Sequence, residues 1–387
     1  MLENAFQGSK RYYALLAVLL FFILVGSSFY LLQLKNGLGY TTGLGRDVSW
    51  GFYIAQLTYL VGVAASAVMV VLPYYLHDYK AFGRITILGE FLAVPAVLMC
   101  LMFVIVDLGR PDRLMNIIKY PTPNSVLFWD MIVLNVYLLL NIVIGWTVLE
   151  AERNEVKPPK WVKPLIILSI PWAPSIHTVT AFLYQGLPGR GYWLTAIMAP
   201  RFLSSAFAAG PSLLILLALL VRKYSKFDPG EEQIQSLAKI VTYAILINVF
   251  FFFCEVFTVF YSQIPHEMIH FQYLFHGIGD KARLVPWMWF SIVGMTAAAL
   301  LMVNPKIREN ETTLALTCGL IIITTYIDKG LGLMTGGFVP NPLEKVVEYW
   351  PTIPEFLISL GVYGVGALIL TLLYRIVLSV REEAGGP

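Results

Sequence analysis

The residues best able to do chemistry in this sequence are ionisable side chains that interrupt long apolar runs. A polar group at membrane depth is costly, so each one is a functional candidate. Each could also pair with a neighbouring helix and only hold the packing together, because intramembrane polar groups join helices as well. The five are Glu90, Asp130, His177, Glu255 and Asp328.

The depths of these residues converge when the apolar runs are treated as helices. At 1.5 Å per residue, His177 lies roughly 21 Å from the start of its run. Glu255 and Asp328 fall at a similar depth, and Asp130 opens a run of opposite direction. These four share the outer third of a core about 30 Å thick, whereas Glu90 belongs to the inner half. An imidazole and carboxylates in a dry pocket suit the oxidation of a quinol, whose hydroxyl must donate a proton to a base.

A polar turn joins two of the runs from Asp107 to Asp130 and reads DLGRPDRLMNIIKYPTPNSVLFWD. Pro111 ends the preceding helix, because proline lacks the N–H and restricts the residue before it. We expect Arg110 to hold carboxylates at the mouth of a quinone pocket, with Asp107 orienting that arginine.

A second pattern, HEMIH at 266–270, matches the HExxH signature of zinc proteases, in which two histidines share one helix face. Tyr273 occupies the position where the extended signature needs glycine, and Pro265 directly precedes the first histidine. The surrounding aromatic residues favour an amphipathic helix on the membrane surface. We predict no metal site here and keep a membrane zinc metalloprotease as the last alternative.

Composition identifies the environment of these residues. The chain has 387 residues, of which 58% are hydrophobic and 13% charged, with a mean hydropathy of +0.71. Soluble domains carry about 25% charged residues, so we predict a multi-pass protein of the cell membrane. A net charge of +3 gives no reason to propose nucleic acid as a partner. The three cysteines form no CxxC or CxxCH, so no haem or iron–sulfur signature is present.

We predict an all-α fold of about ten transmembrane helices in one bundle, treated as a single domain over residues 1–387. A span needs about 20 apolar residues. The first run is too long for a signal peptide and is read as a retained span. More Lys and Arg residues, Lys80 among them, lie in the loops on the N-terminal side, which predicts that both termini are cytoplasmic. The predicted spans are 12–34, 51–76, 85–106, 126–149, 163–185, 202–222, 238–263, 285–303, 313–335 and 355–378.

Several segments resemble the NrfD family, the membrane subunits of polysulfide reductase-type complexes. DLGRPDR at 107–113 and NSVLFWD at 124–130 resemble its outer turn, and RDVSWGFYI at 46–54 resembles its tryptophan–glycine opening. SIHTVT at 175–180 is similar to its histidine segment. The ten-span layout and PWMW at 286–289 are most similar to the DsrP branch, an integral membrane subunit of the Hdr-like menaquinol oxidoreductase (the DsrMKJOP complex).

The resemblance implies a subunit without a redox cofactor of its own that binds menaquinone or menaquinol near the outer face. Electrons would pass between the quinone and an outer, ferredoxin-like iron–sulfur subunit. Further partners would be a membrane cytochrome b, a cytoplasmic iron–sulfur protein and a multihaem cytochrome c, as in sulfate respiration. Carried over by position, the quinone contacts would include Trp50, Tyr53 and Gln56. Both directions of electron flow fit this pattern.

The leading hypothesis is therefore a quinone-interacting membrane subunit of a respiratory redox complex. His177 would accept the proton or bond to a quinone oxygen, assisted by Glu255 and Asp130. Glu90 and Asp328 would lie on a proton path that couples electron transfer to proton movement. The alternative is a proton or ion transporter without quinone chemistry, in which Glu90 and Asn248 form the inward route.

Overall fold

The computed structural model describes residues 2–76 and 82–383. Within these residues, ten helices are long and apolar enough to cross a membrane, and no β-strand is present. The predicted all-α architecture of ten spans is confirmed, with span ends shifted by a few residues. The spans are α1 (Lys10–Asn36), α3 with α4 (Phe52–Ala65, Val68–Leu76), α5 (Gly83–Asp107), α7 (Val126–Arg153), α8 (Val162–Gln185), α9 (Met198–Tyr224), α10 (Glu231–Tyr261), α12 (Val285–Val303), α14 with η5 and α15 (Glu311–Tyr326, Ile327–Gly332, Leu333–Phe338) and α16 (Ile353–Glu383).

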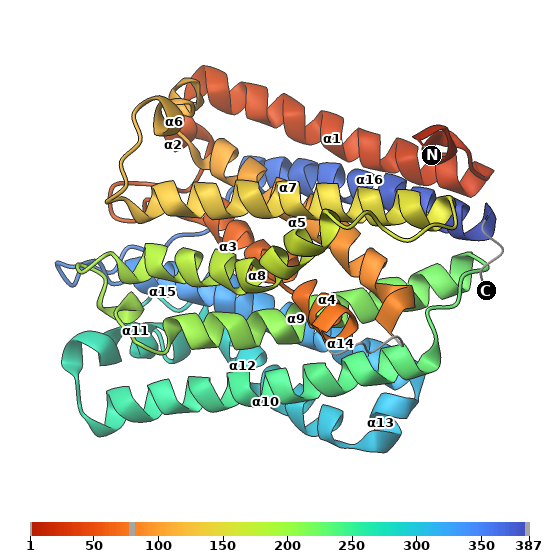
Figure 1. Cartoon of the computed structure of the whole chain (residues 1–387). Coiled ribbons are helices and arrows are strands. Elements are labelled where there is room, and N and C mark those ends of the chain that lie inside the picture. Colours follow the sequence, from red (N-terminus) through yellow and green to blue (C-terminus); the bar gives the residue numbers. More distant parts are fainter. Residues whose placement is uncertain (1, 77–81, 384–387) are drawn as a thin grey trace.

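Short helices occupy several of the connections. They are η1 (Leu2–Phe6), α2 (Leu38–Thr41), η3 (Pro111–Arg113), α6 (Asn116–Lys119), η4 (Gly191–Trp193), α11 (Pro265–Phe275) and α13 (Pro305–Glu309). Both termini lie at one end of the bundle together with α13, and we call this the termini end (Figure 1). The opposite end, which carries α2, α6 and α11, is the far end. That the termini end faces the cytoplasm stays a prediction, and Lys80 lies outside the described residues.

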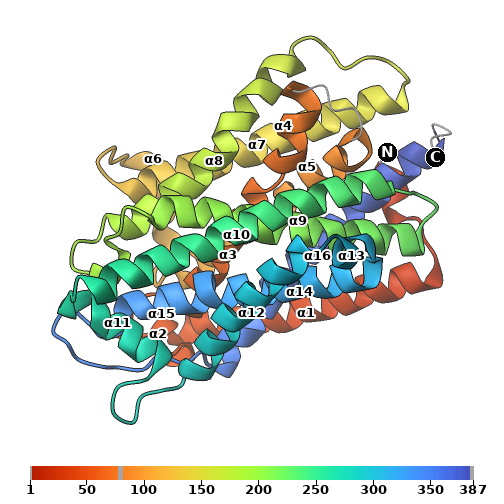
Figure 2. The same ribbon diagram turned by 90° about the horizontal axis from the view of Figure 1, so that it is seen from below.

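Eight of the spans pack as two groups of four, and α3 is the member of its group that faces the other (Figures 1 and 2). Helices α3, α5, α7 and α8 form one group, and α9, α10, α12 and α14 form the other. Helix α3 also packs against α9 and η5, while α16 lies along both α1 and α5. Helix α3 is buried almost all round, whereas α1, which is at least as apolar, is mostly exposed at the edge, as a membrane span can be.

The ninth span is interrupted by a π-helix, η5, where it meets α3. Single π-helical turns inside longer helices are frequent at functional sites. Gly330 allows the close approach, because a Cβ there would lie 3.2 Å from the carbonyl oxygen of Ala55 on α3. The π-helix therefore sits directly against the central helix of the bundle.

Candidate functional site

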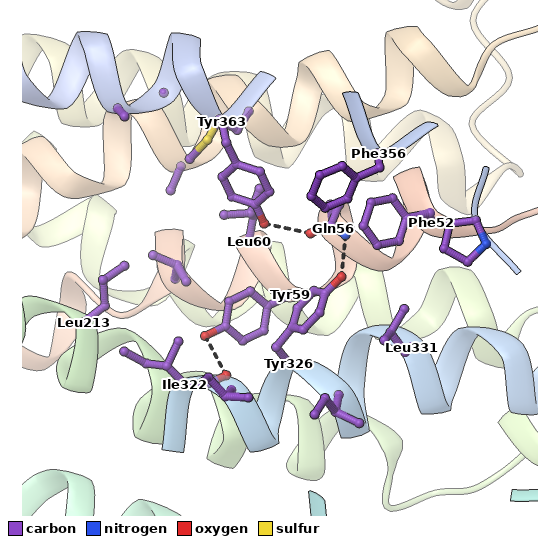
Figure 3. A pocket seen from close by; sticks show the side chains of 18 of the residues that line it. Phe52, Gln56, Tyr59, Leu60, Leu213, Ile322, Tyr326, Leu331, Phe356 and Tyr363 are labelled. Carbon is purple, nitrogen blue, oxygen red and sulfur yellow. Dashed lines mark hydrogen bonds between the residues drawn. The ribbon is translucent and has the colours of Figure 1, made fainter. Parts of the chain in front are cut away.

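A large apolar cavity lies between α3, α5, the ninth span and α16. Its volume is about 800 Å³, and it extends from aromatic residues at the far end towards the middle of the bundle. Figure 3 shows its side chains converging from α3, the ninth span and α16. Apolar wall residues include Leu60, Leu92, Leu213, Leu331, Phe356 and Leu370. Such a cavity can take a hydrophobic molecule of about the size of a drug or an isoprenoid quinone ring with part of its tail.

One polar cluster interrupts this apolar wall. The Tyr363 hydroxyl donates to Oε1 of Gln56 over 2.7 Å, and Nε2 of Gln56 donates to the Tyr326 hydroxyl over 2.5 Å (Figure 3). Nearby, the Tyr59 hydroxyl donates to the carbonyl of Ile322 over 3.3 Å. These neutral groups can orient a ligand through hydrogen bonds.

The far-end mouth of the cavity is held by a phenol that bridges two helices. The Tyr349 hydroxyl donates to Oε1 of Glu355 over 2.6 Å and accepts from the backbone N–H of Phe52 over 2.8 Å. Burial raises the pKa of Tyr349, and the carboxylate of Glu355 raises it further, so the phenol stays protonated. This contact ties the start of α3 to the start of α16.

A pair of basic side chains lies on the opposite face of α3. Nε2 of His177 is 2.5 Å from Nζ of Lys329 and 2.8 Å from the carbonyl of Phe202. Both side chains are buried, and within the described residues Nδ1 of His177 has no hydrogen-bond partner. Nε2 can donate to Phe202 or accept from Lys329, but not both at once. A proton shared by the pair can therefore lie on Nε2 of His177, where it is donated to Phe202, or on Nζ of Lys329, where it is donated to Nε2.

Helix α3 separates this pair from the cavity. A Cβ on Gly62 would lie 3.2 Å from Nζ of Lys329 and 3.3 Å from Cε1 of His177. Tyr59 and Val63 instead line the cavity. The predicted proton acceptor His177 is thus placed behind the central helix, away from the cavity wall.

A buried arginine joins two of the predicted carboxylates. Arg201, in the first turns of α9, forms ion pairs with Glu255 on α10 and with Asp328 on η5, the latter over 2.6 Å. Because Asp328 precedes Lys329, the ion pairs of Arg201 and the contact between Lys329 and His177 meet on one turn of the π-helix. Glu255 also borders a second cavity of about 350 Å³ at the far end.

The two remaining ionisable candidates lie apart from this network. Asp130 is buried and accepts a 2.6 Å hydrogen bond from the Thr180 hydroxyl on α8. Glu90 is buried in the other half of the bundle and borders a cavity of about 390 Å³ at the termini end. Within the described part of the chain, Oε2 of Glu90 has no partner. An unpaired buried carboxylate oxygen is unusual and is a candidate for exchanging protons.

Of the predicted quinone contacts, Gln56 lines the cavity. Trp50 instead stacks on Trp193 with ring centroids 6.1 Å apart, and the Tyr53 hydroxyl donates to Gln33 over 2.9 Å. Both belong to the packing at the far end of α3.

The predicted pairing of Arg110 with Asp107 is wrong. Arg110 forms two 2.9 Å hydrogen bonds with Asp112, and both side chains are exposed. Pro111 turns the chain into η3, which brings residues two apart into reach of each other. Asp107 is half-buried on α5, and within the described residues its Oδ1 has no partner.

The HExxH stretch forms α11, which packs onto the bundle. Nδ1 of His270 lies 3.3 Å from the carbonyl of Val339, and its ring packs against Tyr192. Burial lowers the pKa of His270 to about 4, which keeps the imidazole neutral. Among the described residues no group of three His, Cys, Asp or Glu side chains could hold a metal ion.

The sequence prediction does not include Arg201, Lys329, Tyr326 or Tyr363. Arg201 follows a loop and would be expected at the surface, yet its side chain is buried. Lys329 could have been found, because it directly follows Asp328 inside an apolar run. The tyrosines carry no comparable signal, because aromatic residues are abundant throughout the chain.

Comparison with known proteins identifies the family. The family profile described as "Polysulphide reductase, NrfD" matches residues 41–340. The chain belongs to this family. Together with the ten apolar helices, membership makes it a multi-pass integral protein of the cell membrane.

Named relatives cover almost the whole NrfD-family chain at low identity. A membrane subunit of a putative dimethyl sulfoxide reductase from Halobacterium salinarum is 25% identical over 92% of this chain and 88% of its own length. A selenate reductase subunit from Mesobacillus selenatarsenatis is 24% identical, covering 93% and 92%. An Hdr-like menaquinol oxidoreductase integral membrane subunit from Archaeoglobus fulgidus is 22% identical, covering 97% and 95%. These relatives are named as subunits of oxidoreductases.

Proposed function

We propose that this chain is the quinone-interacting membrane subunit of a respiratory redox complex and that menaquinone binds in the apolar cavity. The observation that carries the proposal is the cavity of about 800 Å³ with one polar cluster, Gln56 between Tyr326 and Tyr363. A quinone needs apolar room for its tail and a few hydrogen bonds for its ring. The relative from Archaeoglobus fulgidus, named as a menaquinol oxidoreductase subunit, supports this choice of ligand.

In this proposal the bound quinone supplies the two-electron, two-proton redox chemistry. Gln56 and the phenols orient the ring, while the apolar wall excludes water. By analogy with the NrfD family, electrons would be exchanged with an iron–sulfur partner subunit at the far end. By analogy with the DsrP branch, the complex would also contain a membrane cytochrome b, a cytoplasmic iron–sulfur protein and a multihaem cytochrome c, as in sulfate respiration.

The quinone proposal is tested by narrowing the cavity. Ala367 lines it from α16, so Ala367→Phe should weaken binding of a short-chain menaquinone at least tenfold. Binding is measured on the full chain in lipid nanodiscs by quenching of tryptophan fluorescence, since Trp287 and Trp350 line the cavity. Leu24→Phe, on the exposed side of α1, is the matched control. Unchanged affinity in both Ala367→Phe and Leu331→Phe would remove the cavity as the site.

We infer further that the buried ionisable residues move protons. Two cavities at opposite ends each border a buried carboxylate, Glu90 at the termini end and Glu255 at the far end. Between them, His177 and Asp328 stay the proposed proton-handling groups, with Asp130 hydrogen-bonded to the same helix, α8, that carries His177. These positions support either proton movement coupled to quinone chemistry or, as the alternative, proton or ion transport without a quinone.

Proton uptake in proteoliposomes separates the two versions. Coupled movement predicts uptake only when quinone turns over in the intact complex, whereas a transporter moves protons without quinone. Glu90→Gln should abolish uptake and leave quinone binding within twofold of wild type, because Glu90 borders a different cavity. Uptake that survives this substitution would exclude Glu90 from the path.

A further inference from the structure

The polar cluster of the cavity has an excess of hydrogen-bond donors. An amide side chain offers one carbonyl oxygen and one NH₂ group. The phenol that faces Oε1 of Gln56 must give its proton to the amide, and here that phenol is Tyr363. The phenol that faces Nε2 accepts from the amide and keeps its own proton, and here that phenol is Tyr326. Turning the amide over would only exchange the two tyrosines, so one phenolic proton is left over in either orientation.

Among the described residues the Tyr326 hydroxyl accepts from Gln56 and donates no hydrogen bond, so its proton is the one left over. Gln56 adds a second N–H, because only one of its two amide protons is used by Tyr326. A buried donor without an acceptor costs more than an unused lone pair on an oxygen. The cluster is therefore completed by a ligand atom that only accepts.

We propose that this cavity distinguishes the two redox forms of its ligand and binds the oxidised quinone more tightly than the quinol. The inference rests on the proposed function, since it specifies the ligand of the same site. A quinone carbonyl has two lone pairs and no proton, so it can accept from Tyr326 and from Gln56 together. A quinol hydroxyl brings a further donor that needs an acceptor of its own. Tyr326 is the specificity-determining donor, and Tyr363 is a positioning residue that acts by holding the amide of Gln56.

Substituting the two tyrosines should have different effects, because Tyr326 acts on quinone binding and Tyr363 acts on quinol binding. Tyr326→Phe removes the free phenolic proton and should weaken quinone binding about fivefold to tenfold, with little change for quinol. Tyr363→Phe frees Oε1 of Gln56 as an acceptor and should strengthen quinol binding by a similar factor. Both substitutions lower the preference for quinone over quinol, Tyr326→Phe by weakening quinone binding and Tyr363→Phe by strengthening quinol binding. Tyr374→Phe is the matched control, because its buried hydroxyl on α16 bonds to the Leu88 carbonyl, away from this cluster.

The experiment uses the full chain in nanodiscs under anaerobic conditions. 2,3-Dimethyl-1,4-naphthoquinone and its chemically reduced naphthoquinol are titrated separately, and thermal unfolding of each variant checks that it is folded. Tighter binding of the quinone by wild type, with the two opposite shifts in the variants, supports the inference. Equal binding of both forms, or a preference unchanged in Tyr326→Phe and Tyr363→Phe, overturns it while the proposed function stands. Failure of both forms to bind wild type overturns the proposed function itself.

Discussion

The two faces of α3 differ in the kind of polar group that they bury. On the cavity side, neutral amide and phenol groups border an open volume of about 800 Å³. On the other side, His177 and Lys329 are packed against each other without such a space. An unpaired neutral donor costs less than an unpaired buried charge, so the cavity side can keep an unused donor for a ligand, whereas Arg201, Glu255 and Asp328 have to pair with one another. In the proposed function, the cavity side would recognise a quinone ring and the other side would hold a proton.

The largest difference between the two faces is expected when the buried cation Arg201 is removed. Arg201→Met leaves Glu255 and Asp328 buried without their partner and should lower the free energy of unfolding by about 3–5 kcal/mol. Thermal unfolding in detergent measures the loss. Neutralising both carboxylates in the same chain, with Glu255→Gln and Asp328→Asn, should recover most of it. On the cavity side, Tyr363→Phe should cost only about 1 kcal/mol. Equal losses from the two single changes would erase the distinction.

A second prediction concerns the pH dependence of stability that arises from His270, which lies on neither face of α3. His270 on α11 is buried, and its pKa falls from 6.5 to about 4 on folding. The unfolded chain therefore binds more protons between these values, so stability should fall as the pH falls from 6.5 towards 4, by about 3 kcal/mol at most. His270→Gln should flatten the dependence of the unfolding temperature between pH 7.5 and pH 5. Any pH dependence left in that variant can then be traced to the other buried groups. A slope that His270→Gln leaves intact would contradict the assignment.

The third prediction tests whether a change on one face of α3 leaves ligand binding on the other face unaffected. Gly62→Val puts methyl groups against Lys329 and His177 and should cost about 1–3 kcal/mol of stability. Quinone affinity should stay within twofold of wild type, because the cavity lies on the other face. Gly319→Val is the matched control, since a Cβ there meets nothing within 4 Å. A large loss of quinone affinity in Gly62→Val alone would show that the faces communicate.

The spans could be predicted from the sequence because bilayer thickness sets the length of an apolar run. The common depth of His177, Glu255 and Asp328 follows from the same geometry, since rise per residue converts position into height. Height does not say which way a side chain points around its helix. For that reason the ion pairs through Arg201 were beyond the sequence prediction.

The cavity could not be predicted for a different reason. Its polar cluster joins Gln56 to Tyr326 and Tyr363, which are 270 and 307 residues further along the chain. No local pattern encodes a contact over such a separation. The turn at Arg110 shows the opposite case, in which the 3₁₀ turn that starts at Pro111 favours Asp112 over the more distant Asp107. The pairing of Arg110 with Asp112 is set by the local geometry of this turn, which the sequence prediction did not include.

The π-helix at Ile327–Gly332 makes the number of residues in this turn of the ninth span critical for the site. An α-helix turns by about 100° per residue, so deleting one residue there would rotate Tyr326 relative to everything that follows. Tyr326 could then no longer face the cavity while Asp328 and Lys329 face Arg201 and His177. Helix α1 is mostly exposed, so the same deletion there would disturb fewer buried contacts, chiefly those of Gly26 with Gly361 and of Gln33 with Tyr53. We therefore expect length variation among natural and engineered sequences to be tolerated at the edge of the bundle and excluded from this one turn.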